Sequence, residues 1–369
     1  RLAEVPYKKI LIVTDPFMAK SKNLNLILDP IKKAGKEYDI FQDIVPDPPI
    51  EKISLGVKKM LEYKPDAIVA VGGGSAIDSS KSIREFALRV DHYAEVGLIA
   101  IPTTSGTGSE VTSFAVVSDP AEQRKYPLVS WELTPDEAIL DAELVKSVPP
   151  AITADTGMDV LTHAIEAYVS IMATDYTDGL AMKAVKLVFE NLPSAYENGA
   201  NDPKAREEMA NASCMAGMAF ANAFLGVNHS MAHKLGAFHH LPHGVANAVI
   251  LTEVMRYNAA EVPTKMGTFS QYQYPHALAR YAELGRFAGC TGKDDKEVFE
   301  NFIAKLEELK EKIGIKKTIK DYGIDEKYFL DTLDEMSEQA FNDQCTGANP
   351  RYPLIQEIKD LYLKCYYGK

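Results

Sequence analysis

The feature that most constrains the fold is the alternation, over the first 150 residues, of short apolar runs with stretches of helical periodicity. The apolar runs lie at residues 9–15, 38–41, 66–71, 98–101 and 138–140. Helical patterns follow the first run through about Ala34 and the second run from Ile50 to Tyr63. Parallel strands are buried on both faces and joined by helical crossovers, which gives continuous apolar runs between helices. The sequence therefore predicts an α/β domain built on a mostly parallel sheet.

The pattern changes after Pro149 and Pro150, where long helical stretches replace the apolar runs. Residues 296–313, for example, carry apolar side chains at helical spacing along an otherwise charged segment. A chain of 369 residues is long enough for about two domains. We therefore predict an α/β domain over residues 1–149 and an all-helical domain over residues 150–369.

Charge and cysteine usage exclude several classes of partner and location. The formal net charge of −12 disfavours nucleic acid as a partner, because phosphate backbones require a basic face. No run of about 18 apolar residues is present, so we expect no membrane association, and the first ten residues lack the apolar core of a signal peptide. The four cysteines are far apart and form no Cys-x-x-Cys motif. This usage fits a reduced, cytoplasmic protein better than a disulfide-bonded one.

Two glycine-rich loops directly follow predicted strands. The first, residues 71–78, reads VGGGSAID, and the second, residues 101–110, reads IPTTSGTGSE. Glycines allow the backbone to approach an anion closely, and free N–H groups at a helix N-terminus stabilise phosphate. Neither loop has the G-x-G-x-x-G or P-loop spacing, so each taken alone is equally well explained as a tight or solvated turn. Two such loops at the strand ends of one sheet favour a bound dinucleotide.

Acidic residues near these strand ends are candidates for contacting the ribose of that dinucleotide. Asp15 ends the first predicted strand, and Asp43 and Asp47 are rivals by position. A carboxylate there would accept hydrogen bonds from ribose hydroxyls and would repel a 2′-phosphate, which favours NAD over NADP. The alternative is that Asp15 only caps a helix.

Histidines are concentrated in one part of the second domain, where five of the eight lie between residues 229 and 243. Upstream, Asp159 and His163 are four residues apart, and positions i and i+4 share a helix face. A single histidine is more often a hydrogen-bonded core residue, but the Asp-x-x-x-His pair together with this cluster favours a metal ion. The clustered imidazoles are those of His229, His233, His239, His240 and His243. Spacing alone does not choose among them.

Together these motifs resemble the iron-dependent (group III) alcohol dehydrogenase family. The matching segments are Val13–Asp15, Gly72–Ser75, Pro102–Glu110, Gly157–Glu166 and His229–Gly244. Within the family, the likeness is closest to the alcohol dehydrogenase domain of bifunctional aldehyde-alcohol dehydrogenases. That likeness is carried by Lys125–Leu128, Phe220–Gly226, Phe269–Tyr272 and Asp343–Pro353.

The resemblance implies roles for individual residues. In the family, an NAD-binding α/β domain and a helical metal-binding domain form the active site in the cleft between them. The implied ligands for Fe²⁺, or for Zn²⁺, are Asp159, His163, His229 and His243. His233 falls where the family places a residue beside the nicotinamide, and we predict that it relays the hydroxyl proton as the catalytic residue. The predicted cofactor-binding residues are Asp15, Asp47, Gly73, Gly74, Ser75, Asp78, Thr103, Thr104, Thr107, Thr112 and Lys125.

The predicted reaction is a reversible hydride transfer between NAD(H) and a small primary alcohol or aldehyde, with ethanol and acetaldehyde favoured. Glycerol-1-phosphate dehydrogenase and dehydroquinate synthase share the architecture, but their anionic substrates call for clustered Lys and Arg. A non-catalytic metal-binding protein would not need two glycine-rich loops. The family also implies at least a homodimer, and the closest likeness makes this chain a candidate part of a larger bifunctional polypeptide.

Basic residues are sparse around the histidines, which bears on the anionic alternatives. The basic side chains between residues 151 and 250 are Lys183, Lys186, Lys204, Arg206 and Lys234. Only Lys234 adjoins the histidine motif, so an uncharged substrate is favoured.

Overall fold

The computed structural model describes residues 1–91, 95–120, 124–260 and 277–368, without the side chains of residues 124 and 125. The Phe269–Tyr272 motif and the side chain of Lys125 therefore lie outside the described residues. The chain divides into two compact units, Arg1–Ser147 and Val148–Lys369.

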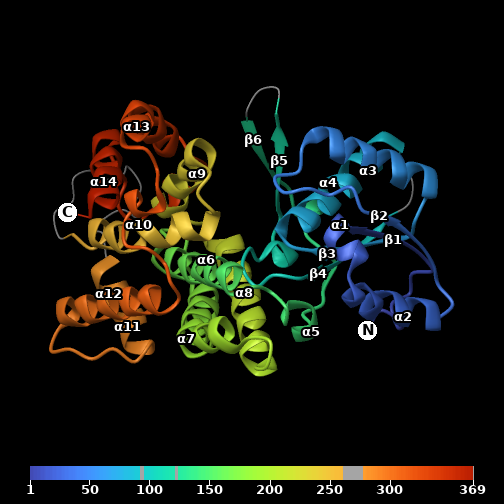
Figure 1. Ribbon diagram of the computed structural model, residues 1–369, viewed down its shortest axis with the longest axis horizontal. Helices are drawn as coiled ribbons and strands as arrows, with labels where there is room; N and C mark the ends of the chain where they lie inside the picture. The colour runs from blue at the N-terminus through green and yellow to red at the C-terminus, as the bar shows by residue number, and fades with distance from the viewer. Residues whose placement is uncertain (92–94, 121–123, 261–276, 369) are drawn as a thin grey trace. The chain divides into compact units, whose positions relative to one another are not determined.

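The first unit is built on the parallel sheet that the sequence predicts (Figure 1). Its strands, in chain order, are β1 (Lys9–Thr14), β2 (Glu37–Phe41), β3 (Ala67–Gly72), β4 (Gly97–Pro102) and β7 (Glu137–Ala138). They are arranged in the order β2-β1-β3-β4-β7, and every neighbouring pair is parallel. The carboxyl ends of β1, β3 and β4 therefore reach the same edge of the sheet, where both glycine-rich loops begin.

Helices cover both faces of this sheet because successive strand residues point to opposite sides. Leu11 and Val13 of β1 pack with the apolar faces of α3 (Ile50–Tyr63) and α4 (Gly74–Asp91). Ile10 and Ile12 belong to a second buried cluster, which includes the apolar residues of α2 (Asn25–Lys33). β1, β3 and β4 thus each contribute to two cores, and this explains why these three strands are almost entirely apolar.

Two details of the first unit differ from the sequence prediction. The single helix expected through Ala34 is interrupted: α1 (Pro16–Lys20) ends at Ser21, whose hydroxyl accepts from the N–H of Asn23 and starts a short 3-10 turn before α2. An unpredicted antiparallel pair, β5 (Phe114–Asp119) and β6 (Arg124–Val129), also lies outside the parallel sheet. Pro127 of β6 lies opposite Val116, whose N–H donates to Asp78 rather than to β6, so the ribbon needs no N–H from the proline at this position.

A network of buried polar groups connects α4 to the second glycine-rich loop. Lys81 is fully buried, and its ammonium donates to the carbonyl oxygen and the hydroxyl of Thr112 at 2.8 and 3.1 Å. Asp78, one turn earlier on α4, accepts from the hydroxyl of Ser109 and, at 3.0 Å, from the N–H of Val116. These bonds fix the loop and the β5 strand against the helix whose N-terminus carries the first glycine-rich loop.

In the second unit, the described residues form helices and no strand. The long helices are α6 (Pro150–Val169), α7 (Asp175–Asn198), α8 (Pro203–Ala223), α9 (Val227–His239), α10 (His243–Asn258), α11 (Ala277–Phe287), α12 (Asp295–Lys312), α13 (Glu326–Phe341) and α14 (Ile355–Tyr367). Side-chain caps begin four of them, at Thr174, Asp202, Asp294 and Asp325. α6 packs against α7, α8 and α10, and α9 packs against α10 and α13 (Figure 1).

α10 begins very close to α6. A Cβ atom on Gly244 would lie 1.9 Å from the backbone oxygen of Asp155, so only glycine fits at this position. The N–H of the next residue, Val245, donates to Oδ1 of Asp155 at 2.8 Å. This approach fixes the first turn of α10, and with it His243, against α6.

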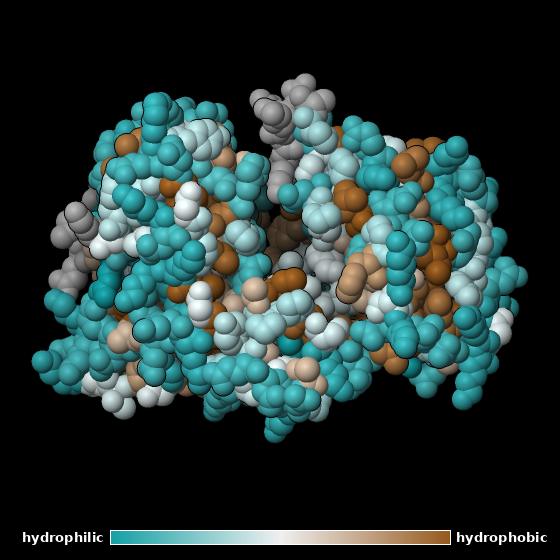
Figure 2. Space-filling view, viewed as in Figure 1, coloured by the Kyte–Doolittle hydropathy of each residue, from teal (hydrophilic) through white to brown (hydrophobic). Residues whose placement is uncertain are grey.

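Most of the face shown in Figure 2 is hydrophilic, and its hydrophobic residues form scattered groups. No single described helix is long and apolar enough to cross a membrane. α8 and α9 together meet that criterion by length and composition only, and the two are bent by 109° at the break between them.

The buried carboxyl group of Glu110 should make the stability of the first unit depend on pH. Burial raises the pKa of Glu110 to about 7, from 4.5 when it is exposed. Between these values the folded chain holds a proton that the unfolded chain has lost, so stability falls as the pH rises through this window. Glu110→Gln should remove that loss and make the first unit more stable than wild type by about 1–3 kcal/mol at pH 8.

The measurement is calorimetry of the full chain at pH 5 and pH 8, following the transition of the first unit. The two proteins should differ little at pH 5, where Glu110 is protonated in the wild type. A variant less stable than wild type at pH 8 would contradict the prediction, because it would mean that Lys81 stabilises an ionised Glu110.

Gly244→Ala should displace the first turn of α10 from α6, because the added methyl group meets backbone rather than a mobile side chain. We expect a destabilisation of about 2–4 kcal/mol in urea denaturation. Gly179→Ala in α7 is the matched control: its Cβ would meet nothing within 4 Å, and alanine should stabilise this helix by about 0.5–1 kcal/mol. Equal stability of the two variants would refute the close approach.

Candidate metal centre and nucleotide site

The four predicted metal ligands come from three helices of the second unit. Asp159 and His163 lie one turn apart on α6, and His229 lies in the first turn of α9. α9 ends at His239, the next residue adopts a left-handed conformation, and α10 begins at His243. The chain therefore reverses within four residues, and His243 returns to the other three.

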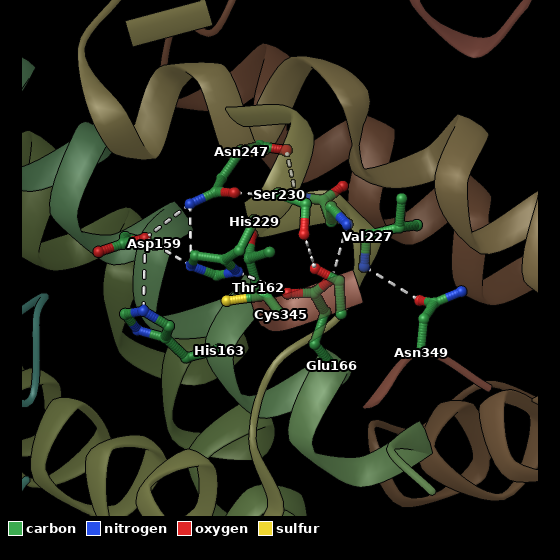
Figure 3. Close-up of polar contacts among 12 residues, drawn as sticks. Asp159, Thr162, His163, Glu166, Val227, His229, Ser230, Asn247, Cys345 and Asn349 are labelled. Carbon is green, nitrogen blue, oxygen red and sulfur yellow. Dashed lines mark hydrogen bonds and ion pairs between the residues drawn. The ribbon is translucent and has the colours of Figure 1, made fainter. Parts of the chain in front are cut away.

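The four side chains are arranged as ligands of a single ion would be, and Figure 3 shows three of them, those of Asp159, His163 and His229. Oδ1 of Asp159 is 3.5 Å from Nε2 of both His229 and His243, and 3.8 Å from Nε2 of His163. All four donor atoms lie within 4.8 Å of one another. Ligands about 2.1 Å from a tetrahedral metal ion are separated by about 3.4 Å, so the set fits a divalent ion with a small adjustment.

The electrostatics of the cluster favour a cation. Asp159 and His229 are almost completely buried. Burial alone would raise the pKa of Asp159, but the neighbouring imidazoles hold this pKa well below its usual range. Burial alone would lower the pKa of His229, but Glu166 and Asp159 raise this pKa to about 9. The negative potential that attracts a proton to His229 would equally attract a metal ion.

Glu166 and Asn349 fix the position of His229. Glu166 lies seven residues after Asp159 on α6, and its Oε2 accepts from Nδ1 of His229, which leaves Nε2 facing the cluster (Figure 3). Its Oε1 accepts from the N–H of Asn228 at 2.8 Å, and Oδ1 of Asn349 accepts from the N–H of Val227 at 3.1 Å. The first N–H groups of α9 are therefore capped by side chains from elsewhere in the unit. Such partners set the tautomer and orientation of a ligating histidine.

Asn247 orients the carboxylate of Asp159. Its Nδ2 donates to Oδ1 of Asp159 at 2.9 Å and lies 3.1 Å from Nε2 of His229. The amide orientation is fixed by Asn228, whose Nδ2 donates to Oδ1 of Asn247 at 3.0 Å. Both asparagines are fully buried, so this bond resists exchange with water.

The remaining clustered histidines lie outside the ligand set. The ring of His233 is stacked against that of His243, with centroids 5.5 Å apart, and its Nδ1 is 3.1 Å from Asp343. His239 bonds to the hydroxyl of Thr332 instead, and His240 forms the C-cap of α9.

In the first unit, the two glycine-rich loops lie against each other. A Cβ atom on Gly73 would be 3.4 Å from Oγ1 of Thr104, and one on Gly74 would be 2.9 Å from Cγ2 of Thr107. The N–H of Thr103 donates to the carbonyl of Gly72 at 2.9 Å. Ser75 follows directly in the first turn of α4, where the helix dipole favours an anion. These contacts bring together most of the predicted cofactor residues.

Asp15 caps a helix and also lies beside the first glycine-rich loop. Its Oδ1 accepts from the N–H groups of Phe17 and Met18 at 2.8 and 2.9 Å, so the capping alternative raised by the sequence is correct. Its Oδ2 would lie 3.6 Å from a Cβ on Gly72. One oxygen thus holds the carboxylate in place, and the other lies at the loop.

The other predicted cofactor residues occupy different surroundings. The side chains of Asp78 and Thr112 are engaged within the protein by the network around Lys81. Asp47 lies in the segment after β2 with a left-handed φ of 49°. Lys125 lies on β6 and pairs with Ser118, while its side chain is outside the described residues. Contacts of these four with a cofactor stay predictions.

Several residues of the site were not predicted. Glu166 continues the helix face of Asp159 and His163 at i+7, and Asn247 follows His243 at i+4, so helical spacing could have indicated both. Asp343 is 110 residues from His233 in sequence, and no local pattern indicates their contact.

Comparisons with known proteins agree with this arrangement. The C-terminal model of the Fe-containing alcohol dehydrogenase family matches residues 153–366, and the model for iron-containing alcohol dehydrogenase matches residues 1–142. The bifunctional aldehyde-alcohol dehydrogenase of Escherichia coli (strain K12) is 46% identical over 98% of this chain. The chain spans only 43% of the length of that relative.

Two further relatives match over almost their full lengths. The NADPH-dependent butanol dehydrogenase of Clostridium saccharobutylicum is 39% identical, with 98% of this chain and 92% of that protein covered. The structure of an iron-containing alcohol dehydrogenase from Thermococcus thioreducens superposes with a TM-score of 0.87 at 35% identity, covering 100% of this chain and 96% of the other. The ligand geometry, both family models and these relatives together show that the chain belongs to the iron-containing alcohol dehydrogenase family.

Proposed function

We propose that this chain catalyses reversible hydride transfer between NAD(H) and a small primary alcohol or aldehyde, with ethanol and acetaldehyde as the preferred pair. The observation that carries the proposal is the cluster of four donor atoms within 4.8 Å from Asp159, His163, His229 and His243. One carboxylate and three imidazoles suit Fe²⁺ or Zn²⁺. A divalent ion held there would polarise the alcohol or aldehyde oxygen as a Lewis acid, and a bound nicotinamide would accept or donate the hydride.

Other residues of this chain would position the metal ligands, transfer the hydroxyl proton and bind the pyrophosphate of the cofactor. Glu166 and Asn247 hold His229 and Asp159 in a fixed orientation, so that little reorganisation accompanies substrate binding. His233 lies beside His243 and is partly exposed, which suits a group that takes the hydroxyl proton and exchanges it with water. The N–H groups at the start of α4 would hold the pyrophosphate of the cofactor.

The proposal favours NAD over NADP because of Asp15. Its capping bonds keep the carboxylate beside Gly72, where a negative charge would repel a 2′-phosphate. The butanol dehydrogenase relative is named for NADPH, so cofactor preference differs among related proteins. Initial rates with NADH and NADPH in one assay would measure the preference of this chain.

An anionic substrate is disfavoured because two of the few basic side chains between residues 151 and 250 already have partners within the protein. Lys234 pairs with Asp343 at 3.0 Å. Arg206 donates to the hydroxyl of Thr153 and the carbonyl of Val148 at 2.8 and 2.7 Å. Neither cation is available to hold a phosphate without losing these bonds, which argues against the glycerol-1-phosphate dehydrogenase and dehydroquinate synthase alternatives.

We further propose a cytoplasmic homo-oligomer, of at least two copies, that acts in fermentation. The bifunctional relatives support the proposal that this chain serves as the alcohol dehydrogenase part of a longer polypeptide with an aldehyde dehydrogenase domain. Light scattering on the purified chain would give the number of copies.

Metal dependence is tested by stripping the protein with a chelator and adding Fe(II) or Zn(II) anaerobically, with NADH and acetaldehyde as substrates. NADH oxidation should be lost on stripping and should return with Fe(II). Asp159→Asn should bind less than one equivalent of metal, because it removes the carboxylate shared by three imidazoles. His239→Asn is the control and should keep its metal. Full activity of the stripped protein would refute the metal mechanism.

His233→Ala should lower kcat by about 10²-fold or more, because a positioned acid–base group is lost, and should change the pH profile of kcat. Metal content, measured by elemental analysis, should stay at the wild-type value. Loss of the metal from this variant would instead make His233 a ligand and remove its catalytic assignment.

A further inference from the structure

His233 has a buried carboxylate behind it. Its Nδ1 lies 3.1 Å from Oδ2 of Asp343, which precedes the short 3-10 helix Gln344–Ala348. The ring of His233 is stacked against that of His243 and lies edge-on to that of His229, with centroids 5.5 and 6.1 Å apart. The histidine therefore lies between the candidate metal ligands and Asp343.

Asp343 is itself held in place from two sides. Its Oδ1 accepts from the N–H of Cys345 at 3.1 Å, and its Oδ2 also accepts from the ammonium of Lys234 at 3.0 Å. Burial alone would raise the pKa of Asp343, but the bonds from His233 and Lys234 keep this pKa far below its usual range. The carboxylate is therefore ionised and can only accept hydrogen bonds. The imidazole nitrogen that faces it must carry a proton.

We propose that Asp343 is a positioning residue that fixes the tautomer of His233, with the proton on Nδ1 and a free electron pair on Nε2. The inference rests on the proposed role of His233 in the reaction. In alcohol oxidation, Nε2 of His233 would take the proton from the breaking O–H bond as the C=O bond forms, and a bound nicotinamide would accept the hydride from carbon. Asp343 then stabilises the resulting imidazolium, and aldehyde reduction reverses each transfer.

A second metal site is the competing explanation of the same geometry, because atoms of His233, Asp343 and Cys345 lie within 4.8 Å of one another. Two observations oppose it. The ammonium of Lys234 already pairs with Oδ2 of Asp343, and it would repel a second cation there. Burial also raises the pKa of the Cys345 thiol well above its usual value, so this thiol is protonated and a poor ligand.

Asp343→Asn tests the proposal with little change of shape. If the amide oxygen keeps the bond from the N–H of Cys345, the amide NH₂ faces Nδ1 of His233 and forces the proton to Nε2. We expect kcat to fall by at least about 10²-fold, as for the corresponding change behind other catalytic histidines, with unchanged KM and metal content. Asp331→Asn is the matched control, because it makes the same change in an exposed carboxylate that pairs with Lys327 on the surface of α13; kcat should stay within about 3-fold of wild type.

A double variant separates positioning from a structural role. If Asp343 acts through His233, Asp343→Asn should cause no further loss of kcat in the His233→Ala background. A loss of the same size in both backgrounds would overturn the proposal, as would an equal loss in Asp331→Asn.

¹⁵N NMR spectra of the zinc-loaded protein show which ring nitrogen of His233 carries the proton, and they require no enzymatic turnover. The His233 signals are assigned from their absence in His233→Ala. The expected result is a protonated Nδ1 in wild type and a protonated Nε2 in Asp343→Asn. A protonated Nε2 in wild type would overturn the proposal even for an active enzyme. The expected spectra from a protein inactive on every alcohol would support the positioning by Asp343 and refute the proposed function alone.

Discussion

The second unit depends on one buried carboxylate. An unpaired Asp159 would be costly to bury, because an ionised group loses its hydration. Three imidazoles and the amide of Asn247 compensate this cost, and all four lie within 3.8 Å of the same oxygen. The compensating groups are themselves held in place by neighbouring residues. Glu166 bonds to His229, and Gly244 lets α10, which carries His243, approach α6 closely. α6, α9 and α10 thus each contribute an imidazole that neutralises this single charge, and the same charge would attract a cation.

α9 connects this cluster to the end of the chain. Asn349 caps its first N–H group, and Asp343 contacts His233 one turn after His229. Both supports belong to the segment that follows α13, more than 100 residues downstream. The helix that carries the histidines is therefore held from α6 at its start and from the C-terminal segment along its length. This explains why a segment without ligands of its own is part of the site.

What could be predicted from the sequence was local. Apolar runs predicted the parallel strands, because a strand that is buried on both faces is apolar along its length, and this is visible in its own sequence. Asp159 and His163 were found because helical spacing alone brings them together. The β5–β6 pair was not predicted; it forms a separate two-stranded sheet, whose strands depend on pairing with each other rather than on a place in the parallel sheet. Asp343 was missed because its partner is distant in sequence, and the family resemblance was needed to select His229 and His243 among the clustered histidines.

His229 and His233 of α9 have the same kind of hydrogen-bond partner but different exposure to solvent. His229 and His233 lie one turn apart, and Nδ1 of each faces a carboxylate, so Nε2 is the nitrogen left for chemistry in both. They differ in exposure: the side chain of His229 is 1% exposed and that of His233 is 37% exposed. A buried imidazole cannot exchange protons with water and is suited to hold a metal ion permanently. A partly exposed imidazole suits the proton transfer proposed for His233. Exposure alone does not separate the two roles, because the side chain of His243 is 43% exposed and its Nε2 lies 3.5 Å from Asp159; membership of the donor cluster around Asp159 is what marks a ligand.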